Sequence, residues 1–203
     1  MNYEESRKWS DSFTKEVFNI LNSEEVIKYT SEPVKRVVRR ATVDEDKNHN
    51  TDLVVEFQRV TKLKIETRVL SKNFKNITIR ATTKYAGYDK ENRKMKDTEF
   101  RTEIQKLLEN GEPDFFLFLW SINKRDVDEY MLVRGGEELA SLLKPPYPEY
   151  EIGMKKDIFY KLNNDKVTGF VGVSFQFLKK NGFILVNKRP PPNYDKYWKN
   201  AFN

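Results

Sequence analysis

The chain has no cysteine and a single histidine, His49, among its 203 residues. The lack of cysteine excludes disulfide frameworks and thiolate metal sites, and it favours a reducing, cytoplasmic setting. A lone histidine excludes zinc sites built from several histidines, and it removes most catalytic schemes that rely on a histidine base. Any metal would therefore be held by oxygen ligands, which favours Mg²⁺ or Mn²⁺.

Long hydrophobic runs are also missing from the sequence. No apolar stretch approaches the length that spans a bilayer, and the first residues, MNYEESRKWS, lack the apolar region of a signal peptide. We therefore expect no membrane partner. The chain is rich in charge instead, with 33% charged residues and a net charge of +6. This positive excess suggests an anionic partner, with nucleic acid as one such partner.

The hydrophobic pattern predicts an α/β fold whose core elements follow the order αβββαβ. Apolar residues at helical spacing predict a first helix over residues 3–22. Three runs rich in β-branched residues predict strands at 52–60, 63–70 and 76–83, which short polar connectors would join into an antiparallel meander. Residues 33–50 change from a basic to an acidic stretch, and we predict no helix or strand there.

A second helix and a buried strand complete the predicted core. The helix in TEFRTEIQKLLEN is expected to be capped by Thr98 or Thr102 and to stop at Gly111. The run PDFFLFLWSI that follows is typical of a buried central strand, and VDEYMLVR is expected to return antiparallel to it. These elements predict a mixed central sheet flanked by helices, within a core of residues 1–144.

The last part of the chain, residues 145–203, is predicted to be an α+β extension packed on this core as part of one domain. Strands are expected in VTGFVGVSF and FILVNK, with a helical turn closed by Gly182 between them. Residues 86–98 are polar and are expected to form a loop.

Two carboxylates stand out in the strand region, Asp52 at the head of one strand and Glu66 in the middle of the next. An acidic residue within an apolar strand is disfavoured unless its surroundings require negative charge. Because strand side chains alternate between faces, Lys64, Glu66 and Arg68 should share one face. With a turn around Thr61, the partner of Asp52 would fall near residue 70, so we expect an imperfect match with Glu66.

The arrangement resembles the PD-(D/E)XK nuclease superfamily over residues 3–134. In that family a helix carries an acid, a strand then presents an aspartate, and the next strand presents (Asp/Glu)-x-Lys on an αβββαβ core. This chain offers Glu16, Asp52 and then Glu66-Thr67-Arg68. The pattern TDLVV…NITIRAT…TEIQKLL…DFFLFLW also looks like a group of phage and prophage proteins, so a virus-infected host cell is one expected location.

The resemblance implies a metal-dependent nuclease that hydrolyses DNA, with a homodimer suited to cutting two strands. Asp52 and Glu66 would bind Mg²⁺ or Mn²⁺, with Glu16 as a further ligand. Arg68 replaces the family's lysine and cannot act as a base, since arginine stays charged. Lys64 or Arg68 would contact the scissile phosphate. The role of the missing lysine would pass to Lys64 or Lys106. Nucleic-acid contacts are predicted for Arg39, Arg40, Arg80 and Lys106.

Other interpretations of the same residues stay open. The first acid would instead be Asp44 or Asp46, with Glu56 as the second. The chain would also suit a non-catalytic nucleic-acid-binding module that kept the fold, or a viral structural or host-interaction protein with an aromatic C-terminal tail. Asp52 would then be a turn residue, and Glu66 and Arg68 an exposed charge pair of little energetic value.

Overall fold

The computed structural model describes most of the chain, in segments separated by short gaps. These segments are residues 5, 8, 9, 12–30, 36–40, 42, 53–57, 62–70, 76–122, 125–151 and 156–189. Within strands β1 (Arg36–Arg40) and β2 (Leu53–Phe57), the one side chain described is that of Val54.

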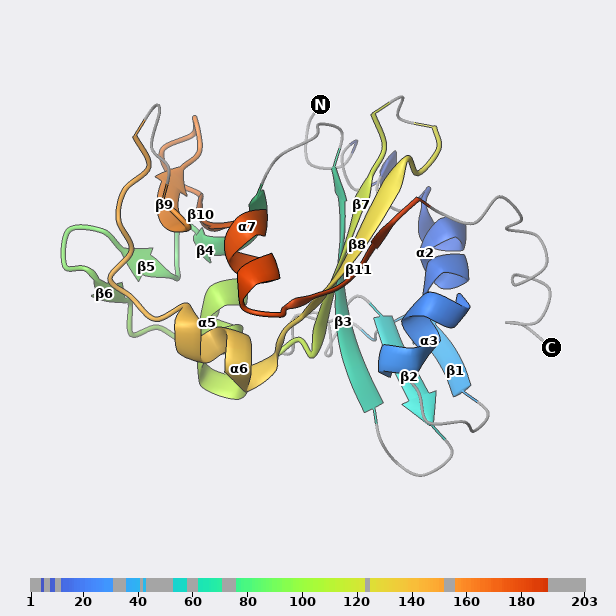
Figure 1. The fold of residues 1–203 in the computed structure, drawn as a ribbon. Helices are drawn as coiled ribbons and strands as arrows, with labels where there is room; N and C mark the ends of the chain where they lie inside the picture. The colour runs from blue at the N-terminus through green and yellow to red at the C-terminus, as the bar shows by residue number, and fades with distance from the viewer. Residues whose placement is uncertain are drawn as a thin grey trace.

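A six-stranded mixed sheet forms the centre of the protein, in the order β1-β2-β3-β7-β8-β11 (Figure 1). Strands β3 and β7 are parallel, whereas the other neighbours are antiparallel. The predicted mixed sheet is therefore confirmed. The remaining bounds are β3 (Lys62–Leu70), β7 (Phe115–Trp120), β8 (Glu129–Arg134) and β11 (Ile184–Lys188).

Helices cover both faces of this sheet, as the sequence predicted (Figure 1). Helices α2 (Thr14–Leu21) and α3 (Glu24–Thr30) pack on one face, against Ile65, Leu117 and Leu119. The opposite face carries Phe116, Phe118 and Trp120 and packs against α5 (Glu103–Asn110), α6 (Gly136–Leu142) and α7 (Phe175–Lys180). Burial on both faces explains why β7 is an uninterrupted apolar run.

The third predicted meander strand lies elsewhere. Strand β4 (Asn76–Thr82) does not pair with β3. It belongs to a second sheet of order β4-β10-β9, with β9 (Ile158–Leu162) and β10 (Gly169–Ser174). The meander prediction was wrong because it relied on the short connector, whereas the apolar face of β4 packs with Val171 and Val173 of β10. Strand β1, which the sequence left unassigned, is the first strand of the antiparallel β1-β2-β3 unit.

Local signals around α5 are confirmed. Thr102 is the N-cap and forms a capping box with Gln105, and Gly111 ends the helix in the left-handed conformation with φ of 66°. In the region expected to be a loop, residues 86–98, the structure has a small hairpin of β5 (Tyr88–Asp89) and β6 (Lys94–Met95). The buried ring of Tyr88 explains this order, since it packs beside Tyr147.

The C-terminal region contributes strands to both sheets. Strands β9 and β10 complete the small sheet, while β11 forms the last strand of the central sheet, with α7 and Gly182 between β10 and β11. The predicted strands and helical turn of this region are confirmed. In the described part of the chain, no helix is long and apolar enough to cross a membrane.

Candidate active site beside a cationic cleft

Four charged side chains from three elements meet at the junction of the two sheets. Arg68 on β3 lies with Nη2 3.2 Å from Oε1 of Glu66, and the same nitrogen pairs with Oε1 of Glu103 on α5. Arg80 on β4 donates its backbone N–H to Oε2 of Glu103 at 2.8 Å, and its Nε is 3.7 Å from Oε1. We call these four residues the Arg68 cluster.

The backbone explains this convergence. Glu66 and Arg68 are two residues apart on β3, so strand alternation places both on one face, as predicted. Glu103 is the first residue of α5, directly after the N-cap Thr102. The start of α5 therefore faces β3 and β4, and Glu103 links the two sheets by contacting an arginine from each.

Burial makes the charges of the cluster interdependent. Glu66 and Glu103 are each 7% exposed, and Arg68 is also partly buried. Burial by itself would raise the pKa of Glu103. The guanidinium groups of Arg68 and Arg80, together with the Arg80 N–H, outweigh that effect and hold the pKa of Glu103 below its usual 4.5. Glu103 is therefore ionised at neutral pH.

This lowered pKa predicts an acid-sensitive contribution to stability. A carboxylate with a lowered folded-state pKa stabilises the fold above its unfolded pKa, and the stabilisation is lost as pH falls through the folded value. We expect the free energy of unfolding to drop as pH falls below about 4.5, and Glu103→Gln to lack this component. Urea denaturation of both proteins across this range measures the difference, and parallel pH profiles would contradict it.

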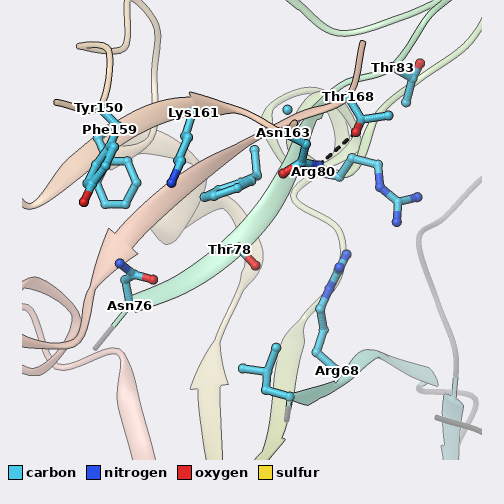
Figure 2. A pocket seen from close by; sticks show the side chains of 13 residues that line it. Arg68, Asn76, Thr78, Arg80, Thr83, Tyr150, Phe159, Lys161, Asn163 and Thr168 are labelled. Atoms are coloured by element: carbon cyan, nitrogen blue, oxygen red, sulfur yellow. Dashed lines mark hydrogen bonds between the residues drawn. The ribbon is translucent and has the colours of Figure 1, made fainter. Parts of the chain in front are cut away.

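A cleft of about 700 Å³ opens beside the cluster, between β3 and the small sheet. Figure 2 shows Arg68 extending from β3 toward Arg80 on β4, with Lys161 of β9 further along the cleft. The described lining residues contain no acid. They are Arg68, Leu70, Asn76, Thr78, Arg80, Thr83, Tyr150, Phe159, Lys161, Asn163, Thr168, Gly169 and Phe170.

The structure unites some predicted residues and separates others. Glu66, Arg68 and Arg80 come together, and Arg80 has a side chain that is 51% exposed. Lys64 pairs instead with Glu112, in the segment that precedes β7, and its backbone N–H donates to Asp114 Oδ2. The Lys64 amine is therefore paired outside the Arg68 cluster.

Three further predicted sites have different outcomes. Glu16 lies on α2, which covers the opposite face of the sheet from α5 and Glu103, so the structure does not bring it to the Arg68 cluster. Lys106 is buried on α5 and does not line the cleft, because it lies on the packed side of the helix. Outside the described part of the chain are Asp52, Asp44, Asp46 and the side chains of Arg39, Arg40 and Glu56.

The register of β2 and β3 corrects the expected turn. Leu53 pairs with Ile65 and Glu56 pairs with Lys62, whereas residue 70 pairs with Trp120 of β7. Each of these β2–β3 pairs is centred on position 59, so the register is centred two residues earlier than Thr61. In the sequence, Asp52 comes directly before Leu53, and Glu66 comes directly after Ile65.

Sequence reasoning missed Glu103 and the far wall of the cleft. An acid in the first turn of a helix is common because it suits the helix dipole, so Glu103 had no distinguishing signal. Tyr150 and Lys161 come from the region predicted to be an extension, and their approach to β3 depends on the pairing of β4 with β10. No local pattern encodes that pairing.

The described residues contain no group of three or more histidine, cysteine, aspartate or glutamate side chains placed to hold a metal. They do bring two carboxylates, those of Glu66 and Glu103, to one guanidinium nitrogen. No protein-family model matches the chain, and neither a curated protein nor a solved structure matches it.

Proposed function

We propose that this protein is a metal-dependent nuclease that hydrolyses phosphodiester bonds of DNA at the Arg68 cluster. One observation carries the proposal. The carboxylates of Glu66 and Glu103 both contact Nη2 of Arg68, at the end of a cleft whose described lining residues include three cationic and no acidic side chains. Carboxylates that can bind a metal ion therefore lie next to arginines that can bind phosphate.

The donor set suits a hard divalent cation. Two carboxylate oxygens converge on one guanidinium nitrogen, and Mg²⁺ commonly uses one or two carboxylates, with waters and substrate phosphates as its other ligands. Glu66 and Glu103 would hold Mg²⁺ or Mn²⁺, and Asp52 joins them on the sequence resemblance. When bound, such an ion supplies an activated water and stabilises charge on phosphate.

The arginines have the complementary role. Arg68 and Arg80 present planar donor groups that bind phosphate oxygens well. They orient the phosphate and stabilise the charge that develops on it. Proton removal falls to a carboxylate, since no lysine belongs to the Arg68 cluster and Lys64 is paired with Glu112.

The order of the elements also supports the proposal. Around the central sheet the chain runs from the helical layer α2–α3 through β1, β2 and β3 to α5 and β7, with β3 parallel to β7. This is the αβββαβ order of the nuclease superfamily that the sequence resembles. Glu66-Thr67-Arg68 lies on β3, the strand that follows β2 in the sequence, and the resemblance expects the second acidic motif on the strand after the one that presents the aspartate.

Cleavage of supercoiled plasmid and branched DNA tests the proposal directly. We expect nicking or linearisation with Mg²⁺ or Mn²⁺ and none with EDTA, because the acids act through a bound cation. A protein that binds DNA but cuts no form of it with either metal would contradict the proposal.

A second function, a non-catalytic nucleic-acid-binding module, is favoured by the charge balance of the Arg68 cluster. Glu66 and Glu103 face Arg68 and Arg80, so the four formal charges sum to zero without a metal. Such a module would bind DNA with an affinity that falls steeply with salt, and it would not cleave.

A further inference from the structure

We propose that the cleft takes a single strand of nucleic acid, with unpaired bases on the aromatic wall and phosphates on the arginines. This inference rests on the proposed function, because it names the substrate class of the same site. It depends on three features of the cleft, namely its aromatic rings, its cations and its polar side chains.

The aromatic wall consists of three neighbouring rings. The centroids of Tyr150 and Phe159 are 5.1 Å apart, and those of Phe159 and Phe170 are 6.5 Å apart. Phe159 is buried and fixes the row, while Tyr150 is 37% exposed and Phe170 is half-buried. Exposed ring area on a rigid support is the feature that single-stranded nucleic-acid-binding proteins use to stack successive bases.

The cations lie where a backbone beside those bases would run. Arg68 and Arg80 mark one end of the cleft, and Lys161 lies with Nζ 4.6 Å from the centroid of the Tyr150 ring. The ammonium therefore lies over one face of the Tyr150 ring, and a base that stacks on that face would displace it toward the adjoining phosphate. None of the described lining residues is acidic, and the carboxylates at the Arg68 end, those of Glu66 and Glu103, face Arg68 and Arg80.

Amides and hydroxyls also line the cleft. Asn76 and Thr78 come from β4, and Asn163 donates its Nδ2 hydrogen to Thr168 Oγ1 at 2.8 Å (Figure 2). Such groups both donate and accept hydrogen bonds, which suits base edges of any sequence.

A duplex fits these features poorly. Its bases are paired and stacked on each other, so their faces cannot reach rings on the wall of a cleft between two sheets. An unpaired strand exposes those faces, and it can place a phosphate at Arg68 while the next bases lie against Tyr150. A strand end or an unpaired branch would therefore bring its phosphate to Glu66 and Glu103.

Fluorescence anisotropy in EDTA tests the inference, because it measures binding without cleavage. The probes are labelled oligothymidine of about 20 nucleotides, a duplex of equal length and oligouridine. We expect the single strands to bind at least about tenfold more tightly than the duplex. Similar affinity for the DNA and RNA strands would show that their shared chemistry is recognised, and a preference would identify the strand that is favoured.

The decisive variant is Tyr150→Ala, for which the chain offers a matched control in Tyr29→Ala. Both tyrosines are 37% exposed, and each has a lysine Nζ above its ring, but Tyr29 lies on α3 away from the cleft. We expect Tyr150→Ala to weaken oligothymidine binding about tenfold and Tyr29→Ala to change it less than twofold. Equal effects of the two substitutions, or duplex binding as tight as single-strand binding, would overturn the inference.

The two proposals fail in different ways. Tyr150-dependent binding of single strands without metal-dependent cleavage would remove the nuclease activity and leave the single-strand cleft standing. Cleavage of duplex plasmid at a rate that Tyr150→Ala does not change would support the nuclease activity and remove the single-strand cleft.

Discussion

Glu66→Gln should lower the rate of Mg²⁺-dependent DNA cleavage by at least about a hundredfold, a loss of about 2.7 kcal/mol in transition-state stabilisation. Glutamine keeps the size of the side chain and can still accept a hydrogen bond from Arg68, but it removes a charged ligand from the cation. Since Arg68 also pairs with Glu103, the arginine keeps a partner and the local geometry should persist.

The matched control for this variant is Glu109→Gln. Glu109 lies on α5 like Glu103, but it pairs with Arg101 on the surface and does not line the cleft. We expect Glu109→Gln to cleave at the wild-type rate, and Glu66→Gln to bind DNA in EDTA with nearly wild-type affinity. If Glu66→Gln cuts DNA as fast as the wild type, Glu66 is not a ligand of the catalytic cation, and this part of the proposal is wrong.

The parts of the fold that the sequence predicted are those in which local pattern and long-range packing agree. Strand β7 is apolar at every position because helices cover both faces of the sheet, so its burial could be inferred from composition alone. The end of α5 at Gly111 follows from a backbone conformation that glycine adopts easily. The shared face of Glu66 and Arg68 follows from the two-residue period of a strand.

The parts that were missed depend on contacts between distant segments. The alternation in β4 shows that one face is buried, but it does not show that β10, almost a hundred residues later in the sequence, is the partner. Arg80, Tyr150 and Lys161 line one cleft only as a result of that pairing. Glu103 was missed for the same reason, since its partners Arg68 and Arg80 come from different sheets. A site built at the junction of two sheets has no contiguous motif.

Glu103→Gln should destabilise the fold by roughly 2–4 kcal/mol at neutral pH, the cost of removing one partner from a buried ion pair. Glutamine can still accept the Arg80 N–H, so the loss is mainly electrostatic. Arg68 would then keep one carboxylate, that of Glu66, while Arg80 is half-exposed and can gain water. Solvation of Arg80 places the expected value toward the lower end of the range. Urea denaturation measures it, and Glu109→Gln on the surface should cost less than about 1 kcal/mol.

A double-mutant cycle with Arg68→Met distinguishes a specific ion pair from general loss of packing. If Glu103 stabilises the fold through Arg68, the double variant should be more stable than the sum of the two single effects predicts, because each single variant already loses the Arg68–Glu103 pair and the double variant loses it only once. Additive effects would mean that water screens the pair. In that case the opposing charges of the Arg68 cluster would be held only weakly, and both arginines would be available to phosphate at little cost to the fold.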